Sequence, residues 1–176
     1  MAVITIPFDY DERTHPTIVP ICIADTDSEG NAVHRGWIDF GVVPVVDRFF
    51  IYDLQKDSII NQGLVAHGNC FEYWLEGRKY SNVVGSGCTS LGKYKIGIPY
   101  NGKFGYSYKL HGLDSSNNNA FERTVVLHSH SCIPEKEVSD DICQSNGCPT
   151  VAPGFLTRLK DIINHSGKPV LLWIYE

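Results

Sequence analysis

Two side chains in the last third of the chain have the types and spacing needed for acyl transfer. The β-type run 123–127 leads to His128, and twenty positions later Cys148 follows Gly147. A thiol reacts as its thiolate and has a reference pKa near ~8.5, so it needs a neighbouring imidazole to take its proton. A glycine permits a sharp turn, after which the N–H groups of Gly147 and Cys148 can face a developing oxyanion. We interpret Cys148 as the nucleophile and His128 as its base. A structural cysteine and a hydrogen-bonded core histidine are the alternatives.

The segment His128-Ser129-His130 also permits a second chemistry. A His-x-His on a strand can present two imidazoles as metal ligands, and Cys132, Cys143 or Cys148 could complete a zinc site. A zinc-dependent peptidase is therefore the rival enzyme. Because most short His/Cys clusters are not metal sites, we expect no metal and no cofactor.

Six cysteines are more than a reducing cytosol usually leaves unpaired. With Cys148 free, five remain, and an odd number cannot all pair within one chain. Cys132 and Cys143 could staple the segment between His128 and Cys148, and Cys70 with Cys88 is a second possible pair. Buried free cysteines are the alternative.

Composition indicates one domain with a real core, because the 176 residues are 43% hydrophobic and 11% aromatic. The net charge is −5 and the basic residues form no long cluster, which argues against nucleic acid as a partner. No apolar run approaches eighteen residues, so we expect no transmembrane segment. No signal peptide is visible at the start, and no pattern indicates an oligomeric state.

The elements that position these residues are expected to be mainly strands. Sixteen glycines, nine prolines and many β-branched residues favour strands with frequent turns. Asn101-Gly102 predicts a hairpin turn. The one clear helix runs from Phe155 to about His165, with Pro153 suited to its first turn. We predict a mainly β sandwich or barrel with one helix after Cys148. The expected strands are 17–24, 37–46, 48–54, 58–66, 91–98, 104–110 and 170–175.

The segment Ser145-Asn146-Gly147-Cys148-Pro149, with the upstream His128-Ser129, resembles the catalytic block of a known family. It is similar to the L,D-transpeptidase (YkuD-like) family, and most similar to its murein L,D-transpeptidase catalytic-domain-like branch. The likeness is colinear over roughly 48–176, so we expect a catalytic domain at 47–176 and a strand-rich extension at 1–46. It also includes the stretches 64–68, 89–92, 102–107, 110–114 and 119–123.

The resemblance implies a cysteine acyl-transferase acting on peptidoglycan stem peptides. Cys148 would attack the stem tetrapeptide at the L-centre of its diamino acid and release D-alanine, leaving a thioester. An amine would then form a 3→3 cross-link (L,D-transpeptidase), or water would complete an L,D-carboxypeptidase reaction. By position, the Ser129 backbone carbonyl would orient His128, and Gly147 would contribute to the oxyanion hole. Such enzymes act outside the cytoplasm of bacteria, so a periplasmic or extracellular location is expected.

The resemblance also suggests residues that bind substrate. Ser145 would support the pocket, Asn146 replaces a histidine of many members, and His67 and His130 could line the cleft. No arginine follows Cys148 closely, so Arg123 is the candidate clamp for the substrate carboxylate. The alternatives are a core or turn role for His67 and an ion pair of Arg123 with Glu122 or Asp114. A catalytically idle wall-binding module is the third functional class.

Overall fold

The computed structural model describes residues 21–22, 49–53, 58–75, 79–166 and 170–175. The strands expected at 37–46, and most of the one at 17–24, lie outside these ranges. The loop 54–57 between the expected strands 48–54 and 58–66 is also outside them, but the two strands pair antiparallel as a hairpin requires.

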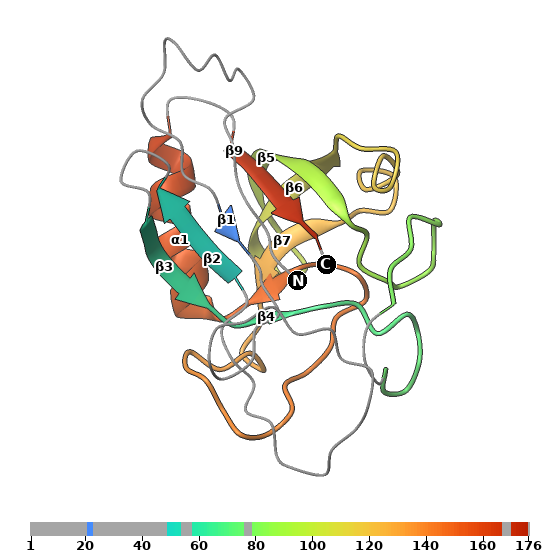
Figure 1. The fold of residues 1–176 in the computed structure, drawn as a ribbon, viewed down its shortest axis with the longest axis horizontal. Helices are drawn as coiled ribbons and strands as arrows, with labels where there is room; N and C mark the ends of the chain where they lie inside the picture. Colours follow the sequence, from blue (N-terminus) through green and yellow to red (C-terminus); the bar gives the residue numbers. More distant parts are fainter. Residues whose placement is uncertain (1–20, 23–48, 54–57, 76–78, 167–169, 176) are drawn as a thin grey trace.

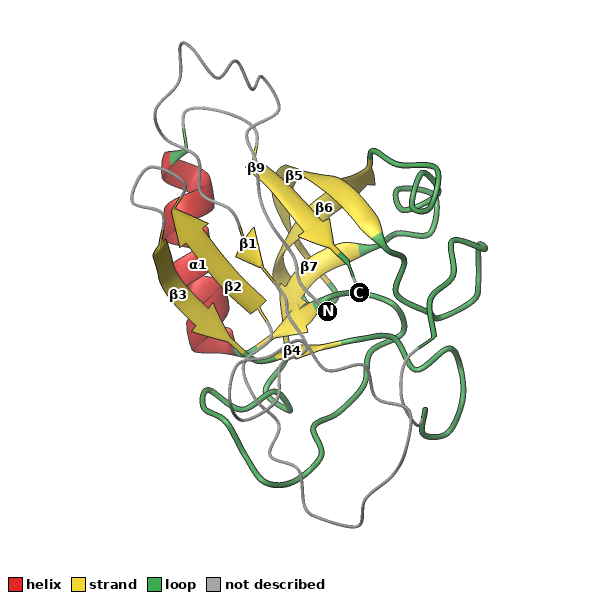
Figure 2. Ribbon diagram, in the orientation of Figure 1, coloured by secondary structure: helices red, strands yellow, loops and turns green. Residues whose placement is uncertain are grey.

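Within these ranges nine strands form one curled sheet, in the order β3-β2-β1-β9-β5-β6-β7-β8-β4 (Figures 1 and 2). Neighbours run antiparallel except for the parallel pairs β1–β9 and β7–β8. This arrangement confirms the expected mainly β fold. The strands are β1 (Ile21–Cys22), β2 (Phe49–Asp53), β3 (Ser58–Gly63), β4 (Val65–Ala66), β5 (Gly92–Gly102), β6 (Gly105–Gly112), β7 (Val126–Ser129), β8 (Thr150–Val151) and β9 (Val170–Ile174).

The hairpin of β5 and β6 turns two residues later than the sequence predicted. Gly102 pairs with Gly105, so the turn residues are Lys103 and Phe104, and Asn101 stays in the ladder opposite Tyr106. Gly105 accepts the positive φ of +72° that this turn requires. The prediction of a turn at Asn101-Gly102 was wrong because local turn preference yields to the pairing register of two long strands. As a result Phe104 lies at the hairpin tip.

Helix α1 (Pro153–His165) begins two residues after β8, with Pro153 in its first turn. Its buried residues are Phe155, Leu156 and Leu159, which confirms the predicted apolar face. The Phe155 ring packs edge-on against Phe49 of β2, with centroids 5.2 Å apart. The helix thus packs on the part of the sheet that contains β2 and β3, as Figure 1 shows.

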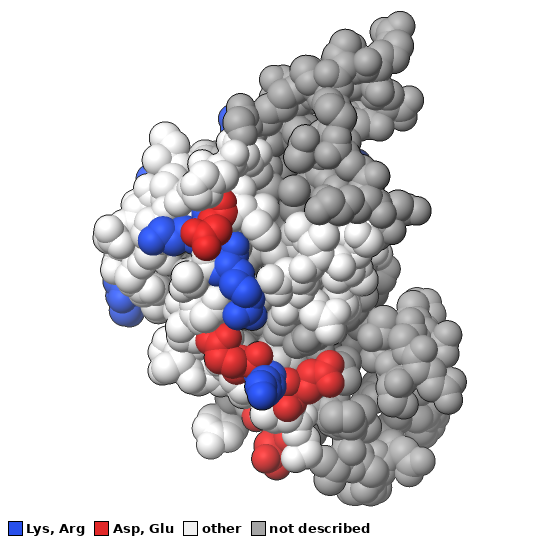
Figure 3. Space-filling model, turned by 90° about the vertical axis from the view of Figure 1, so that its left-hand side faces the viewer, with Lys and Arg blue, Asp and Glu red and all other residues white. Residues whose placement is uncertain are grey.

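The structure pairs four of the cysteines. Cys70 is bonded to Cys88, and Cys132 to Cys143, as the sequence analysis had allowed. Cys148 is free. Of the helices in the described ranges, none is long and apolar enough to cross a bilayer. On the face drawn in Figure 3, acidic and basic side chains lie interspersed.

Candidate active site

His128 lies in β7, an interior strand of the sheet. It pairs with Ser107 of β6 on one side and with Thr150 of β8 on the other. The side chain is only 5% exposed. Its Nδ1 lies 3.1 Å from the backbone oxygen of Ser129. Because a carbonyl only accepts, Nδ1 carries the proton and Nε2 is left as an acceptor. The expected orienting role of Ser129 therefore has the required geometry.

Cys148 lies in the turn that leads into β8. The Ser145 hydroxyl donates to the Cys148 carbonyl at 2.6 Å and accepts the Gly147 N–H at 3.2 Å. Gly147 has φ +108°, a conformation that side-chain-bearing residues rarely adopt. Ser145 thus stabilises the turn itself. An oxyanion would have to compete with Ser145 for the Gly147 N–H, and the oxyanion role of Gly147 stays a prediction.

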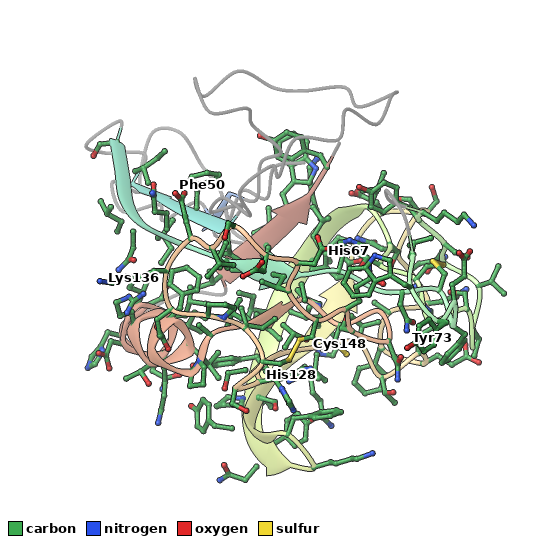
Figure 4. The ribbon with its side chains drawn as sticks, turned by 90° about the horizontal axis from the view of Figure 1, so that it is seen from below. Phe50, His67, Tyr73, His128, Lys136 and Cys148 are labelled. Carbon is green, nitrogen blue, oxygen red and sulfur yellow. A yellow bond between two sulfur atoms is a disulfide. The ribbon has the colours of Figure 1, made fainter. Side chains whose placement is uncertain are left out.

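Thr150 contacts both His128 and Cys148. Its Oγ1 lies 3.0 Å from His128 Nε2 and 3.3 Å from the Cys148 carbonyl oxygen. Thr150 pairs with His128 in the parallel β7–β8 ladder, and Cys148 comes two residues before Thr150 in the segment that leads into β8. In the view of Figure 4, Cys148 and His128 are drawn next to each other near the centre. Thr150 thus contacts both the predicted base and the backbone of the predicted nucleophile.

Burial favours the neutral form of both groups. It lowers the pKa of His128, an effect that the Ser129 hydrogen bond partly offsets and that His130 reinforces. Burial raises the pKa of the Cys148 thiol, against the opposing effects of a backbone hydrogen bond with Val126 and of the Arg123 charge. At neutral pH the resting site accordingly holds a thiol and an uncharged imidazole. Such a pair works by general-base transfer of the thiol proton.

Phe104 covers the His128 ring. The two rings stack with centroids 4.3 Å apart and planes 19° from parallel. Phe104 is itself 43% exposed, at the tip of the β5–β6 hairpin. Sequence reasoning missed both Phe104 and Thr150. Thr150 stood two residues after the cysteine in the sequence, but its contact with His128 depends on the β7–β8 register.

Arg123 is already occupied by the protein. Its Nη1 donates to the Ser81 carbonyl at 2.7 Å and to Ser90 Oγ at 3.0 Å. Its Nη2 donates to Ser86 Oγ at 3.3 Å and to the Cys88 carbonyl. These bonds to described residues use four of the five N–H donors of the guanidinium and leave the one on Nε. This arrangement disfavours the bidentate carboxylate clamp considered for Arg123. The alternative of an ion pair with Glu122 or Asp114 does not occur among the salt bridges of the described residues.

The other predicted binding residues surround the turn. The His67 carbonyl accepts the Ser145 N–H at 2.8 Å, and His67 Nδ1 lies 3.0 Å from the Gly68 carbonyl oxygen. The partly buried His67 therefore supports the strand-like segment before Cys148, which agrees with the turn role left open for it. Asn146 is exposed at the tip of the turn. Their contacts with substrate stay predictions.

His130 contacts Cys132. Within the described ranges, the group of His, Cys or acidic residues close enough to bind a metal consists of His130, Cys132 and Cys143, with ligand atoms within 4.8 Å. His128 and Cys148 do not belong to it. The two sulfurs are bonded to each other, and His130 Nδ1 contacts Cys132 Sγ at 2.8 Å. This geometry supplies no thiolate ligands and does not favour the zinc peptidase.

Comparison with known families gives one match to this chain. A family model described as L,D-transpeptidase catalytic domain matches residues 21–175. The match starts before the 47–176 domain expected from sequence and includes β1. The boundary at 46/47 itself stays a prediction. No curated protein and no solved structure matches the chain significantly.

Proposed function

The chain belongs to the family of L,D-transpeptidase catalytic domains, and we propose that Cys148 and His128 transfer acyl groups of peptidoglycan stem peptides. Family membership supports peptidoglycan as the substrate. The observation that supports the proposal is the β7–β8 pairing, which sets His128 opposite Thr150, two residues after Cys148, whose thiol is free. A reaction on peptidoglycan takes place in the periplasm or outside the cell, where the two disulfides are stable.

The first step is proton transfer from Cys148 to His128. Nε2 of His128 accepts the Thr150 hydroxyl in the resting site, so that bond must be released first. The hydroxyl has a second acceptor, the Cys148 carbonyl 3.3 Å away, and rotating toward it frees Nε2. The Ser129 carbonyl then stabilises the imidazolium through Nδ1–H.

Acyl transfer follows from this exchange. The Cys148 sulfur bonds to the carbonyl carbon at the L-centre of the stem diamino acid, and the tetrahedral oxyanion meets the backbone N–H of Cys148. The imidazolium returns its proton to the nitrogen of the departing D-alanine as the C–N bond breaks. An acceptor amine, or water, then attacks the thioester with His128 as base and restores the thiol. The amine gives a 3→3 cross-link and water gives the carboxypeptidase product.

Incubation with muropeptide tetrapeptides tests the proposal, with mass analysis for free D-alanine, dimers and a Cys148 acyl-enzyme. Cys148→Ala should form no acyl-enzyme while keeping its fold. His128→Ala should lower the acylation rate by about 10²–10⁴, the usual effect of a positioned base. His165→Ala is the matched control, because that histidine is exposed at the end of α1.

Normal turnover by Cys148→Ala would refute the proposal. A wild-type protein that binds peptidoglycan but forms no acyl-enzyme, and whose Cys148 resists thiol reagents, would indicate the idle wall-binding module instead.

A further inference from the structure

Arg123 holds a partly buried positive charge that no acid neutralises among the described residues. Its four terminal hydrogen bonds go to two backbone carbonyls and two serine hydroxyls, all of them uncharged. The salt bridges within the described ranges are Lys79–Glu72 and Arg158–Glu135. Removing a charge from water is costly unless an opposite charge or strong hydrogen bonds compensate for it. Its electrostatic effect is therefore available to an anion formed nearby.

The guanidinium lies directly behind the catalytic turn. A Cβ built on Gly147 would be 3.4 Å from Arg123 Nη2 and 2.8 Å from the Cys88 carbonyl oxygen, which Nη2 binds. Thr89, next to Cys88, bonds the same turn through its hydroxyl, 3.5 Å from the Gly147 carbonyl. Arg123 thus fixes the segment 81–90 against which Gly147 and Cys148 rest.

The charge of Arg123 also acts on the sulfur. Burial raises the pKa of the Cys148 thiol, and the positive charge of Arg123 opposes that effect. Burial lowers the pKa of Arg123, and the charges of Tyr94 and then of Cys148 oppose that effect. Both effects have the sign expected for a cation facing a thiolate.

We propose that Arg123 is a positioning residue for acyl transfer, which holds the 81–90 segment against the Gly147–Cys148 turn and stabilises the anionic sulfur through its unneutralised charge. The inference rests on the proposed function of Cys148 as nucleophile. In this proposal Arg123 acts through the segment 81–90 and the Gly147–Cys148 turn, and it does not contact the substrate carboxylate.

The effect of the Arg123 charge on the Cys148 thiolate is tested by alkylation of Cys148, which needs no substrate. Rates with iodoacetamide are followed by mass analysis of the Cys148 peptide between pH 6 and 10, for wild type, Arg123→Gln, Arg123→Met and Arg123→Lys. At neutral pH the two neutral variants should alkylate about three- to tenfold more slowly, because less thiolate is present. Arg123→Lys keeps the charge and should stay within about twofold of wild type. Ser86→Ala removes one bond to Nη2 and the acceptor of the Cys88 N–H, but no charge, and should alkylate at a rate close to that of Arg123→Lys.

The positioning part is tested by turnover of the stem tetrapeptide. Arg123→Lys cannot reproduce four hydrogen bonds in a planar fork, so kcat should fall about tenfold or more while KM changes by less than about threefold. A raised KM with unchanged kcat would instead indicate the carboxylate clamp and overturn the inference.

If Arg123→Gln or Arg123→Met folds and its Cys148 alkylates at the wild-type rate, the claim that the Arg123 charge stabilises the thiolate is overturned. If neither variant folds, Arg123→Lys decides, because a marked loss of alkylation despite the retained charge would contradict it. Failure of the proposed function is distinguishable. In that case wild type would not turn over stem peptides, whereas the alkylation differences between Arg123 variants would persist.

Discussion

Gly147→Ala should damage both stability and catalysis, because the site needs glycine for two separate reasons. The first is conformational: φ is +108°, and a side-chain-bearing residue held in such a region costs about 1–3 kcal/mol. The second is steric: the new Cβ would be 2.8 Å from the Cys88 carbonyl oxygen. That oxygen is backbone and is held by Arg123, so it cannot move away as a flexible side chain would.

Together these effects should lower the free energy of unfolding by about 2–4 kcal/mol. For a domain of this size, about 1 kcal/mol shifts Tm by roughly 2–4 °C, so Tm should fall by roughly 5–15 °C. Any relief of the overlap moves Cys148 relative to His128. A displacement near 1 Å at reacting atoms costs on the order of 10²-fold in rate. Acyl-enzyme formation should therefore fall by about that factor even where the variant is fully folded.

Gly85→Ala is the matched control. Gly85 also has a positive φ, +78°, but a Cβ there meets nothing within 4 Å. It should cost about 1 kcal/mol for the conformation alone and leave acylation unchanged. Thermal unfolding and the rate of Cys148 acylation are measured on both variants. The comparison separates the cost of the positive φ from the cost of the close approach to the Cys88 carbonyl oxygen. Equal Tm values and equal acylation rates for the two variants would refute the argument that Gly147 is required by its close approach to Cys88.

Two further predictions concern pH and the second disulfide. The pKa of His128 is lowered from 6.5, so the unfolded chain binds that proton more readily, and stability should fall as pH drops below about 6.5. The pKa of Cys148 is raised from 9.0, so stability should fall again above about pH 9, where the unfolded thiol ionises first. The free energy of unfolding, measured with a chemical denaturant across this pH range, checks both dependences. His128→Gln should abolish the contribution of His128 to the loss of stability at low pH. Replacing Cys132 and Cys143 together by serine opens a loop of sequence separation 11 and should cost about 3 kcal/mol by calorimetry. Because neither sulfur contacts His128 or Cys148 among the described bonds, acylation at 20 °C should persist, and its loss in a folded double variant would contradict this.

The local features of the site could be predicted from the sequence because each has a local physical cause. Gly147 before Cys148 indicates a sharp turn, Pro153 and the apolar spacing of Phe155, Leu156 and Leu159 predict α1, and an apolar run after Pro169 predicts β9. The structure confirms the helix and the strand. The likeness of the catalytic segment to its family was also visible in the residue order, and the family match over residues 21–175 agrees with it.

What only the tertiary structure decided are the contacts that depend on register and on long-range packing. Thr150 reaches His128 Nε2 because β8 pairs in parallel with β7 at that residue. Phe104 stacks on His128 because the β5–β6 hairpin turns at Lys103 and Phe104, against the local preference of Asn101-Gly102. Arg123 bonds residues 33 to 42 positions before it, a set that no spacing rule indicates. Pairing register and burial are properties of the whole sheet, so the residue types at these positions could suggest chemistry but could not assign their partners.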